Sequence, residues 1–422
     1  MDIGFVGLGK LGLPIALAIE AKGHTVVAHD PAEGPREMVR ARRLAFREAG
    51  ADALLARTRI ELLSMEEMVR RAEIIFVTIQ TPHEPQFEGV TRLSAETRDF
   101  DYAALRAGVA QLAAAIEAVG QERTVLVVST VLPGTIRREI KPLLGRHARL
   151  GYNPFFISMG NAIGDFLNPE FVLLGVDDDR SAAVAEAFYR TIHGAPIRRT
   201  TLEEAEITKV LYNTFISTKI AFANTAMEIC HHVPGADVDV VLGVLRGARE
   251  RIISGKYLGA GMGDGGACHP RDNIALSHLS AGLGLSFDWF RCVMEQRERQ
   301  SEWLADLIEA ARGGRAVVLL GRSFKAESNI LTGSPVLLLE TILRERGVRV
   351  EAWDPHVDTD VPPPPAGRPA CYFIGTRHPE FQAWPFAPGS VVLDPWRYVT
   401  VPEGVELIPI GRGGPLPPPA AA

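Results

Sequence analysis

The chain of 422 residues is too long for one compact core, so we expect two or three domains. Its composition is that of a soluble globular protein, with 46% hydrophobic and 23% charged residues, and a net charge of −6 argues against nucleic-acid binding. The pattern predicts no signal peptide and no membrane-spanning segment, and the four cysteines are scattered, so we expect a cytoplasmic protein with free thiols.

The chain opens with the order of elements found in dinucleotide-binding units. An apolar strand over residues 3–6 leads into a glycine-rich loop, a helical pattern follows over 13–21, and a second strand over 25–29 ends at Asp30. The loop itself reads Gly7-Leu8-Gly9-Lys10-Leu11-Gly12. In such a loop the first glycine makes the turn, the second lets a pyrophosphate approach the backbone and the third lets the helix pack on the strand. The sequence therefore predicts that this loop binds NAD; a glycine turn with a purely structural role is the alternative.

Asp30 and a nearby arginine bear on the choice between NAD and NADP. A carboxylate at this position accepts hydrogen bonds from the ribose hydroxyls and repels a 2′-phosphate, which favours NAD. Arg36 lies close enough in the sequence to attract a 2′-phosphate, so it keeps NADP open. We expect NAD.

Short apolar runs alternate with helical patterns along the rest of the chain. Strands are expected at residues 74–79, 124–128, 172–175, 316–321, 348–353, 371–374 and 390–394, and long helices at 202–230, 287–311 and 335–346. This alternation predicts an α/β protein with two Rossmann-like doubly wound domains joined by a central helical domain with a long helix. We expect the NAD-binding domain at 1–200, the central domain at 201–312, the second Rossmann-like domain at 313–414 and a disordered tail at 415–422.

Hydroxyl side chains follow two of the predicted strands. Thr81 comes after the strand at 74–79, and Ser129 and Thr130 come after the strand at 124–128. Ligands of doubly wound sheets collect at the carboxyl ends of strands. These hydroxyls therefore either contact the cofactor or position a water, or they are ordinary turn and cap residues.

The predicted helix at 202–230 carries polar residues on one face of an otherwise apolar pattern. Glu206, Lys209, Asn213 and Asn224 are separated by close to whole helical turns. A buried stripe of this kind needs partners, so it is either a polar ligand site or a structural hydrogen-bond network. We favour the ligand site. Because the helix has a second apolar face that needs cover, we also expect a homodimer.

A glycine-dense loop in the middle of the chain carries a cysteine. It reads Gly263-Asp264-Gly265-Gly266-Ala267-Cys268-His269-Pro270-Arg271-Asp272. A thiol placed there becomes a nucleophile if nearby charge favours its thiolate, and otherwise it is a small buried hydrophobe. Cys230, His231 and His232 have no further ligands at suitable spacing, so no metal site is predicted.

The second Rossmann-like unit lacks the dinucleotide motif. Its first loop reads Gly321-Arg322-Ser323-Phe324-Lys325. We expect this unit to hold a different, phosphate-bearing ligand with Lys325 as a point charge; a solvated surface lysine is the alternative.

Five motifs together resemble the nucleotide-sugar 6-dehydrogenases, the family that includes UDP-glucose and GDP-mannose dehydrogenases. In the family's order, and through nearly the whole chain, they are the loop 7–12, the segment 129–135, the helix segment 206–213, the loop 265–272 and the segment 323–325. The resemblance implies oxidation of the C6 alcohol of a nucleotide sugar to the carboxylate, using two NAD per substrate.

The same resemblance implies roles for individual residues. Cys268 would attack the aldehyde stage to give a thiohemiacetal and then a thioester, while Lys209 and Asn213 stabilise the oxyanion. Asp272 would move protons with an ordered water, and Thr130 would help to hold water and substrate.

Binding residues follow from the resemblance as well. Those implied for the cofactor are Gly7, Gly9, Lys10, Leu11, Gly12, Asp30, Ser129, Thr130 and Arg271. Those implied for the nucleotide sugar are Lys209, Asn213, Tyr257, Gly265 and Lys325.

Some positions depart from the family's pattern. Phe155 and Met159 stand where carboxylates usually occur, one of which is thought to activate water for thioester hydrolysis. Thr332-Gly333 replaces an arginine and a glutamate. The alternatives are therefore a dehydrogenase that stops at the aldehyde or acts on another nucleotide-linked alcohol, and a catalytically silent binding protein. His269, beside the thiol, is a candidate base for hydrolysis.

Overall fold

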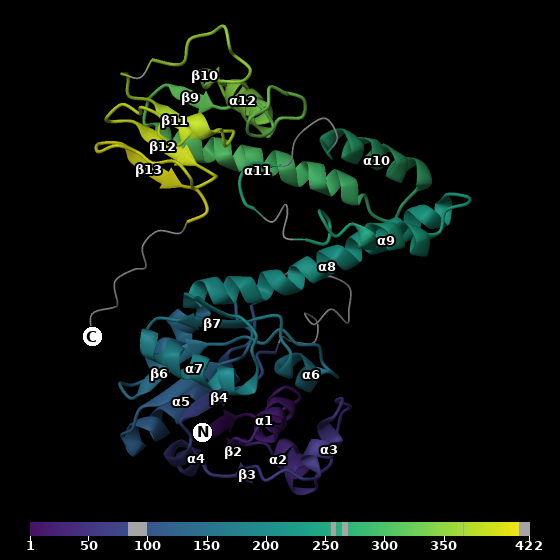
Figure 1. The fold of residues 1–422 in the computed structure, drawn as a ribbon, viewed down its shortest axis with the longest axis vertical. Coiled ribbons are helices and arrows are strands. Elements are labelled where there is room, and N and C mark those ends of the chain that lie inside the picture. Colours follow the sequence, from purple (N-terminus) through teal and green to yellow (C-terminus); the bar gives the residue numbers. More distant parts are fainter. Residues whose placement is uncertain (83–98, 255–258, 264–268, 366, 413–422) are drawn as a thin grey trace. The chain divides into compact units, whose positions relative to one another are not determined.

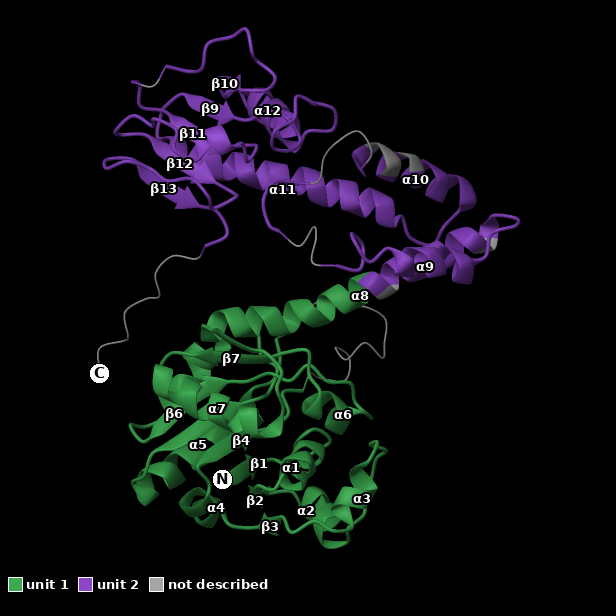
Figure 2. Cartoon of the chain, viewed as in Figure 1, with its two compact units in different colours: residues 1–218 green, residues 219–422 purple. Residues whose placement is uncertain are grey.

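The computed structural model describes residues 1–82, 99–254, 259–263, 269–365 and 367–412, with the side chains of 220, 231, 271, 272 and 275 left out. The chain forms two compact units, Met1–Thr218 and Lys219–Ala422 (Figure 2). Each unit contains one sheet, and Figure 1 labels several strands of each. The division into three domains stays a prediction.

An eight-stranded sheet forms the centre of the first unit. Its strands are β1 (Asp2–Val6), β2 (Thr25–His29), β3 (Glu61–Leu62), β4 (Ile74–Val77), β5 (Arg123–Val127), β6 (Ala148–Tyr152), β7 (Val172–Val176) and β8 (Ile197–Thr200). They lie in the order β3-β2-β1-β4-β5-β6-β7-β8, and all neighbours are parallel except β6 and β7. The first six positions have the strand order of a dinucleotide-binding fold, in which the ligand binds where the order reverses, between β1 and β4.

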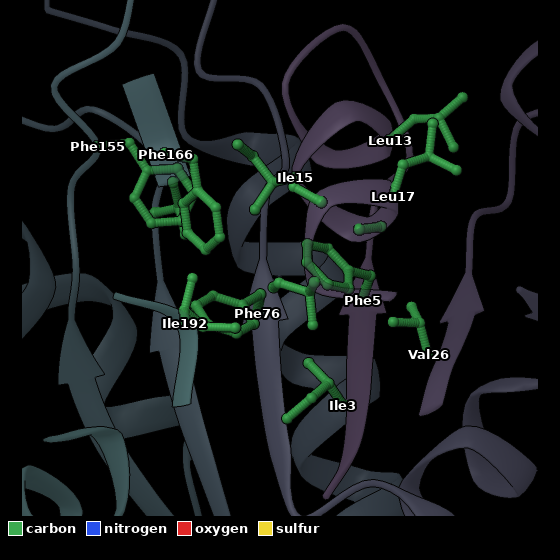
Figure 3. Packing of buried hydrophobic residues seen from close by; sticks show 14 of the residues in the cluster. Ile3, Phe5, Leu13, Ile15, Leu17, Val26, Phe76, Phe155, Phe166 and Ile192 are labelled. Carbon is green, nitrogen blue, oxygen red and sulfur yellow. The ribbon is translucent and has the colours of Figure 1, made fainter. Parts of the chain in front are cut away.

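Helices cover both faces of this sheet. They are α1 (Gly12–Ala21), α2 (Glu33–Arg40), α3 (Ala51–Leu55), α4 (Met65–Arg71), α5 (Ala103–Val119), the π-helix η2 (Ile136–Ile140), the 3-10 helix η3 (Lys141–Leu143), α6 (Ala162–Leu167) and α7 (Asp179–Ile192). Side chains of β4 alternate between the two faces. Phe76 belongs to the core that includes Phe5 of β1 and Leu13 of α1 (Figure 3), while Ile75 belongs to the core that includes Leu112 of α5.

A long helix, α8 (Leu202–His232), leads out of the first unit and into the second. It begins with a capping box in which the N–H of Glu204 donates to Thr201 Oγ1 at 3.2 Å and the N–H of Thr201 donates to the Glu204 carboxylate at 3.0 Å. The helix predicted over 202–230 is confirmed. Three further helices follow: α9 (Val238–Gly247), α10 (His269–Leu283) and α11 (Trp289–Arg312).

The second unit contains a smaller, fully parallel sheet. Its strands are β9 (Val317–Leu320), β10 (Val350–Trp353), β11 (Cys371–Ile374), β12 (Val391–Asp394) and β13 (Glu406–Pro409), in the order β10-β9-β11-β12-β13. Leu304 of α11 and Leu339 of α12 (Pro335–Glu345) pack in one core with Leu319 and Phe373 of the sheet. The predicted fold class, two Rossmann-like α/β units with a long helix between them, is confirmed.

Four strands were absent from the expectations: β3, β6, β8 and β13. β3 has two residues, and β6 and β8 carry arginines, so none of these three segments forms an apolar run. Within the described part of the chain, no helix combines the length and apolar character needed to cross a bilayer. The predicted tail at 415–422 lies outside the described residues.

Candidate active site

The glycine loop between β1 and α1 is closely packed at its ends and open in its middle. Gly7 has a φ of +100°, and Thr78 Oγ1 donates to its carbonyl oxygen at 2.8 Å. A Cβ on Gly12 would lie 2.3 Å from that oxygen, so packing inside the protein requires glycine there. A Cβ on Gly9 would meet only Gln80 Nε2, at 3.8 Å. The space beside Gly9 is therefore room for a ligand.

Asp30, at the end of β2, is tied to this loop. One carboxylate oxygen accepts from the N–H of Leu8 at 2.7 Å and the other from the N–H of Ala32 at 2.8 Å. Each oxygen keeps a second lone pair for a further donor, such as a ribose hydroxyl. Arg36, the cation that kept NADP open, pairs with Glu33 at 3.0 Å. The local geometry thus fits the predicted preference for NAD.

A cavity of 430 Å³ lies beside the loop. It is lined by Gly9, Lys10, Leu11, Thr78, Ile79, Gln80, Thr81, Pro82, Phe100, Val128, Ser129, Thr130, Phe155, Ile157, Met159 and Lys209. The glycine loop, the segments after β4, β5 and β6, and α8 all contribute to its wall. These regions are far apart in the sequence, and all belong to the first unit.

The hydroxyls predicted at the strand ends bind neighbouring segments. Ser129 Oγ donates to the carbonyl oxygen of Ile79 at 2.5 Å, and Thr81 Oγ1 donates to the carbonyl oxygen of Thr130 at 2.7 Å. Both bonds join the segment after β4 to the segment after β5. This geometry gives Ser129 and Thr81 a structural contact, and both still line the cavity together with Thr130, so their contact with the cofactor stays a prediction.

Lys209 is the buried cation of the cavity wall. Its side chain is 9% exposed, and Nζ donates to the carbonyl oxygen of Phe155 at 2.7 Å. The ammonium also lies 5.1 Å from the centre of the Phe156 ring. Burial lowers the pKa of Lys209 from its usual range. The structure thus brings the predicted lysine to the same cavity as the glycine loop and Thr130.

The other members of the polar stripe on α8 behave differently. Glu206 has no exposed surface, and its two carboxylate oxygens accept from the N–H groups of Gly134 and Ile136, at 2.6 and 2.7 Å. It therefore belongs to a structural network. Asn213 and Asn224 are exposed, and neither lines the cavity, so the expectation of one buried polar stripe is correct only for Glu206 and Lys209.

The segment after β6 brings apolar side chains to the cavity where the family's pattern has carboxylates. Phe155 is 8% exposed and contacts the rings of Phe76 and Phe166, with centroids 6.2 and 5.5 Å away. Met159, four residues further on, is exposed. Among the described residues that line this cavity, none has a carboxylate.

Several predicted site residues cannot be compared with the geometry. Tyr257, Gly265 and Cys268 lie outside the described residues, and so do the side chains of Arg271 and Asp272 within α10. In the second unit, Lys325 is exposed, with its ammonium 5.4 Å from the centre of the Phe324 ring. The roles of these residues, and of Asn213, stay predictions.

The acid of the second unit is bonded more completely than Asp30. Asp354, which ends β10, has no exposed surface and accepts from the N–H groups of Arg322, Ser323 and His356 at 2.7, 2.8 and 2.9 Å. His378 Nε2 is a fourth donor, at 3.0 Å. Burial alone would raise the pKa of Asp354, but these hydrogen bonds hold it below its ordinary value.

The sequence analysis did not single out Thr78, and it named Glu206 without its partners. Thr78 fixes the turn at Gly7, and Glu206 fixes the segment after β5. The sequence analysis treated Thr78 as an ordinary residue of the expected strand at 74–79, so it did not predict the contact of Thr78 with Gly7. A polar residue near the end of a buried strand was the available signal for it.

The residues present fit NAD. The loop leaves room at Gly9, the helix N-terminus of α1 follows it directly, and Asp30 is oriented by two backbone N–H groups beside that loop. Lys209 and Thr130 lie on the wall of the adjoining cavity.

Comparisons with known proteins agree with this geometry. Models of the UDP-glucose/GDP-mannose dehydrogenase family match its NAD binding domain at residues 1–193 and its central domain at residues 203–298, which together make up more than half of the chain. A GDP-mannose 6-dehydrogenase of Pseudomonas putida is 29% identical over 371 residues, covering 85% of this chain and 81% of the relative. A UDP-glucose 6-dehydrogenase of Rickettsia conorii is 27% identical over 366 residues, covering 84% and 81%.

Solved structures give the same result. A GDP-mannose dehydrogenase from Pseudomonas aeruginosa has a TM-score of 0.86 at 25% identity, covering 96% of this chain and 99% of that one. A UDP-glucose dehydrogenase from Pyrobaculum islandicum has a TM-score of 0.53 at 27% identity, covering 97% and 96%. The chain therefore belongs to the UDP-glucose/GDP-mannose dehydrogenase family of NAD-dependent oxidoreductases.

Proposed function

We propose that the protein oxidises the primary C6 alcohol of a nucleotide sugar to the carboxylate, with Cys268 as the nucleophile. The observation that carries the proposal is the cavity beside the glycine loop, where Lys209 and Thr130 line the wall next to Gly9 and Lys10. Relatives named as UDP-glucose 6-dehydrogenase and GDP-mannose 6-dehydrogenase support the substrate class.

The proposed chemistry divides a four-electron oxidation into two steps. Bound NAD supplies the hydride acceptor in each. The thiolate of Cys268 adds to the aldehyde carbon, giving a thiohemiacetal that the second oxidation converts into a thioester. Water then cleaves the thioester, which releases the acid and restores the thiol.

The chain's own residues stabilise charge and move protons. Lys209 and Asn213 would stabilise the negative oxygen of the thiohemiacetal, and the low-dielectric setting of Lys209 would strengthen this effect. Asp272 would take a proton from the attacking water, which Thr130 helps to orient. The nucleotide part would be held by Tyr257, Gly265 and Lys325, with Arg271 near the cofactor.

One observation favours a second candidate function, a dehydrogenase that stops at the aldehyde. The described wall of the cavity has Phe155, Ile157 and Met159 after β6 and no carboxylate to activate water. An enzyme without such a base hydrolyses a thioester slowly, so its thiol would stay acylated. Such an enzyme would turn over only by releasing the aldehyde before the second hydride transfer, and the aldehyde would then accumulate.

The experiment that separates these functions counts NADH per substrate consumed. Purified protein is incubated with NAD and either UDP-glucose or GDP-mannose, and products are identified by mass. Two NADH per substrate, with the uronic acid as product, support the full oxidation; one NADH, with the aldehyde, supports the second candidate. No NADH from either sugar nucleotide contradicts the full oxidation of these two substrates and leaves a dehydrogenase for another nucleotide-linked alcohol or a catalytically silent binding protein. The Cys268→Ser variant should lose acid formation and keep its affinity for NADH.

The proposal extends to assembly and location. Exposed apolar side chains on α8 and α9, including Phe222, Met227, Val240 and Val244, support a homodimer formed through these helices. A cytoplasmic location follows from the expected chemistry of the free thiols.

A further inference from the structure

Two ionisable side chains on the first turns of α8 each bind the backbone of a different segment. Glu206 accepts from the N–H groups of Gly134 and Ile136, at 2.6 and 2.7 Å. Lys209, one turn further along the same face of the helix, donates to the carbonyl oxygen of Phe155 at 2.7 Å. One face of α8 is therefore bonded both to the segment after β5 and to the segment after β6.

The segment after β5 carries Thr130 at one end and leads into the π-helix η2 at the other. Near its start, the carbonyl oxygen of Thr130 accepts from Thr81 Oγ1 at 2.7 Å, and in its middle the N–H of Leu132 donates to Tyr102 OH at 3.1 Å. At its far end the first N–H groups of η2 have no partner within the helix. Glu206 supplies the acceptor for Ile136, the first residue of η2.

The two N–H groups bonded to Glu206 favour its ionised form, whereas burial opposes it. Burial raises the pKa of Glu206 above its ordinary value, and the hydrogen bonds from the two N–H groups offset only part of that shift. The charged and titratable groups that face it are Glu203 on its own helix, Arg138 on η2 and Tyr152 on β6. A protonated carboxyl would keep acceptor lone pairs but lose the negative charge that strengthens both hydrogen bonds, which would weaken the anchor.

We propose that Glu206 is a positioning residue, which holds the segment carrying Thr130 at a fixed position relative to Lys209 on α8. Glu206 does not line the cavity, so it acts through the segment rather than on the substrate or the cofactor. The inference rests on the proposed function, because it assigns Glu206 to the alignment of two groups that the reaction would use.

Glu203 provides a matched control. It lies on the same helix, about one turn before Glu206, and its carboxylate also contacts η2, but through the guanidinium of Arg137 rather than through backbone N–H groups. Glu203→Gln therefore removes a charge from the same interface without removing the anchor of the segment.

The test compares Glu206→Gln and Glu206→Asp with Glu203→Gln in the full chain. The Asp variant keeps the buried charge but is one methylene shorter, and it is measured in the same way if the Gln variant does not fold. We expect kcat with UDP-glucose or GDP-mannose to fall about tenfold or more in the Glu206 variants only, while the dissociation constant for NADH stays within about threefold of the wild type. Amide hydrogen exchange should become faster over residues 129–140.

Two results would overturn the inference: a kcat in the Glu206 variants equal to that of Glu203→Gln, or equal losses of kcat and NADH affinity with faster exchange throughout the first unit. The second result would mean general stabilisation. A wild-type protein that oxidises neither sugar nucleotide would instead overturn the proposed function. The NADH and exchange measurements would then still decide whether Glu206 anchors the segment, because neither requires turnover.

Discussion

Buried charges beside the cavity are stabilised by backbone groups rather than by opposite charges. Asp30 accepts from Leu8 and Ala32, Glu206 from Gly134 and Ile136, and Lys209 donates to Phe155. Each of these bonds joins a side chain to a segment that ends a strand or begins a helix. Such charge-assisted bonds are stronger than neutral ones, so they set the positions of these segments.

Asp30→Asn tests the acid at the residue scale. The amide puts an N–H₂ group opposite one of the two backbone N–H groups, and it no longer repels a 2′-phosphate. We expect NADH affinity to fall about tenfold, or about 1.4 kcal/mol, and NADPH affinity to fall less or to rise. Fluorescence titration with both nucleotides measures this. Glu37→Gln, at an exposed carboxylate on α2, is the control; equal losses for both nucleotides would contradict a role in discrimination.

Lys209 predicts a pH dependence of stability. Its pKa is lowered in the folded protein, so between the lowered value and the ordinary one the unfolded chain binds more protons, and stability rises with pH. Lys209→Met removes this dependence. We therefore expect the wild type to gain stability relative to the variant as the pH is raised from 7 toward 10, as measured by urea unfolding. A difference that stays constant across that range would show that burial of the ammonium has no energetic effect.

Asp30 and Lys209 could be predicted because each belongs to a local pattern, a strand end and a helix face. The hydrogen-bond partners of Thr78 and Glu206 could not be predicted from the sequence. Thr78 binds Gly7 and Glu206 binds Gly134, each across about seventy residues of sequence, and such a contact depends on how the sheet is assembled. The difference between Glu206, which anchors a segment, and Lys209, which lines the cavity, was therefore not visible in the shared helix face.

At the scale of elements, the glycines between β1 and α1 differ in how much space surrounds them. A Cβ on Gly12 would collide with backbone, whereas a Cβ on Gly9 would meet only the end of the Gln80 side chain, at 3.8 Å. Glycine is needed at the first position for the packing of helix on strand, and at the second we expect it to let the cofactor approach the backbone.

Gly9→Ala should therefore leave the fold intact and impair cofactor binding. We expect a Tm within about 2 °C of the wild type and a loss of NADH affinity of about tenfold or more. Gly34→Ala, at a position where a Cβ meets nothing within 4 Å, is the control and should leave NADH affinity unchanged. A normal NADH affinity in Gly9→Ala would place the cofactor elsewhere.

The elements predicted correctly are those with a strong local signal. The apolar strands β1, β4, β5, β7 and β9 and the long helix α8 were expected close to their observed bounds. β6 and β8 were missed because their arginines interrupt the apolar pattern on which the prediction relied. Both segments form strands because their backbones pair with β5 and β7. The antiparallel step between β6 and β7 likewise has no signature in a single sequence.

At the scale of the whole molecule, the exposed apolar side chains of α9 predict assembly. Val240 and Val244 are 65% and 72% exposed on successive turns of this helix. Val244→Glu should shift sedimentation from twice the mass of one chain to that of a single chain, because a buried unpaired carboxylate opposes association. Val361→Glu, at another exposed valine outside these helices, is the control. A wild-type protein that sediments as one chain would contradict the homodimer.

The two Rossmann-like units differ in what their acids can still do. Asp30 has one backbone donor on each oxygen, whereas Asp354 has no exposed surface, and three of its four donors crowd one oxygen. In the described part of the chain, only the first unit thus has an acid that a dinucleotide ribose could reach. If four electrons leave the substrate, spent NADH must depart and fresh NAD must arrive before the second pair can go. The half-oxidised sugar has to wait through that exchange, and a covalent tether is what would keep it from diffusing away.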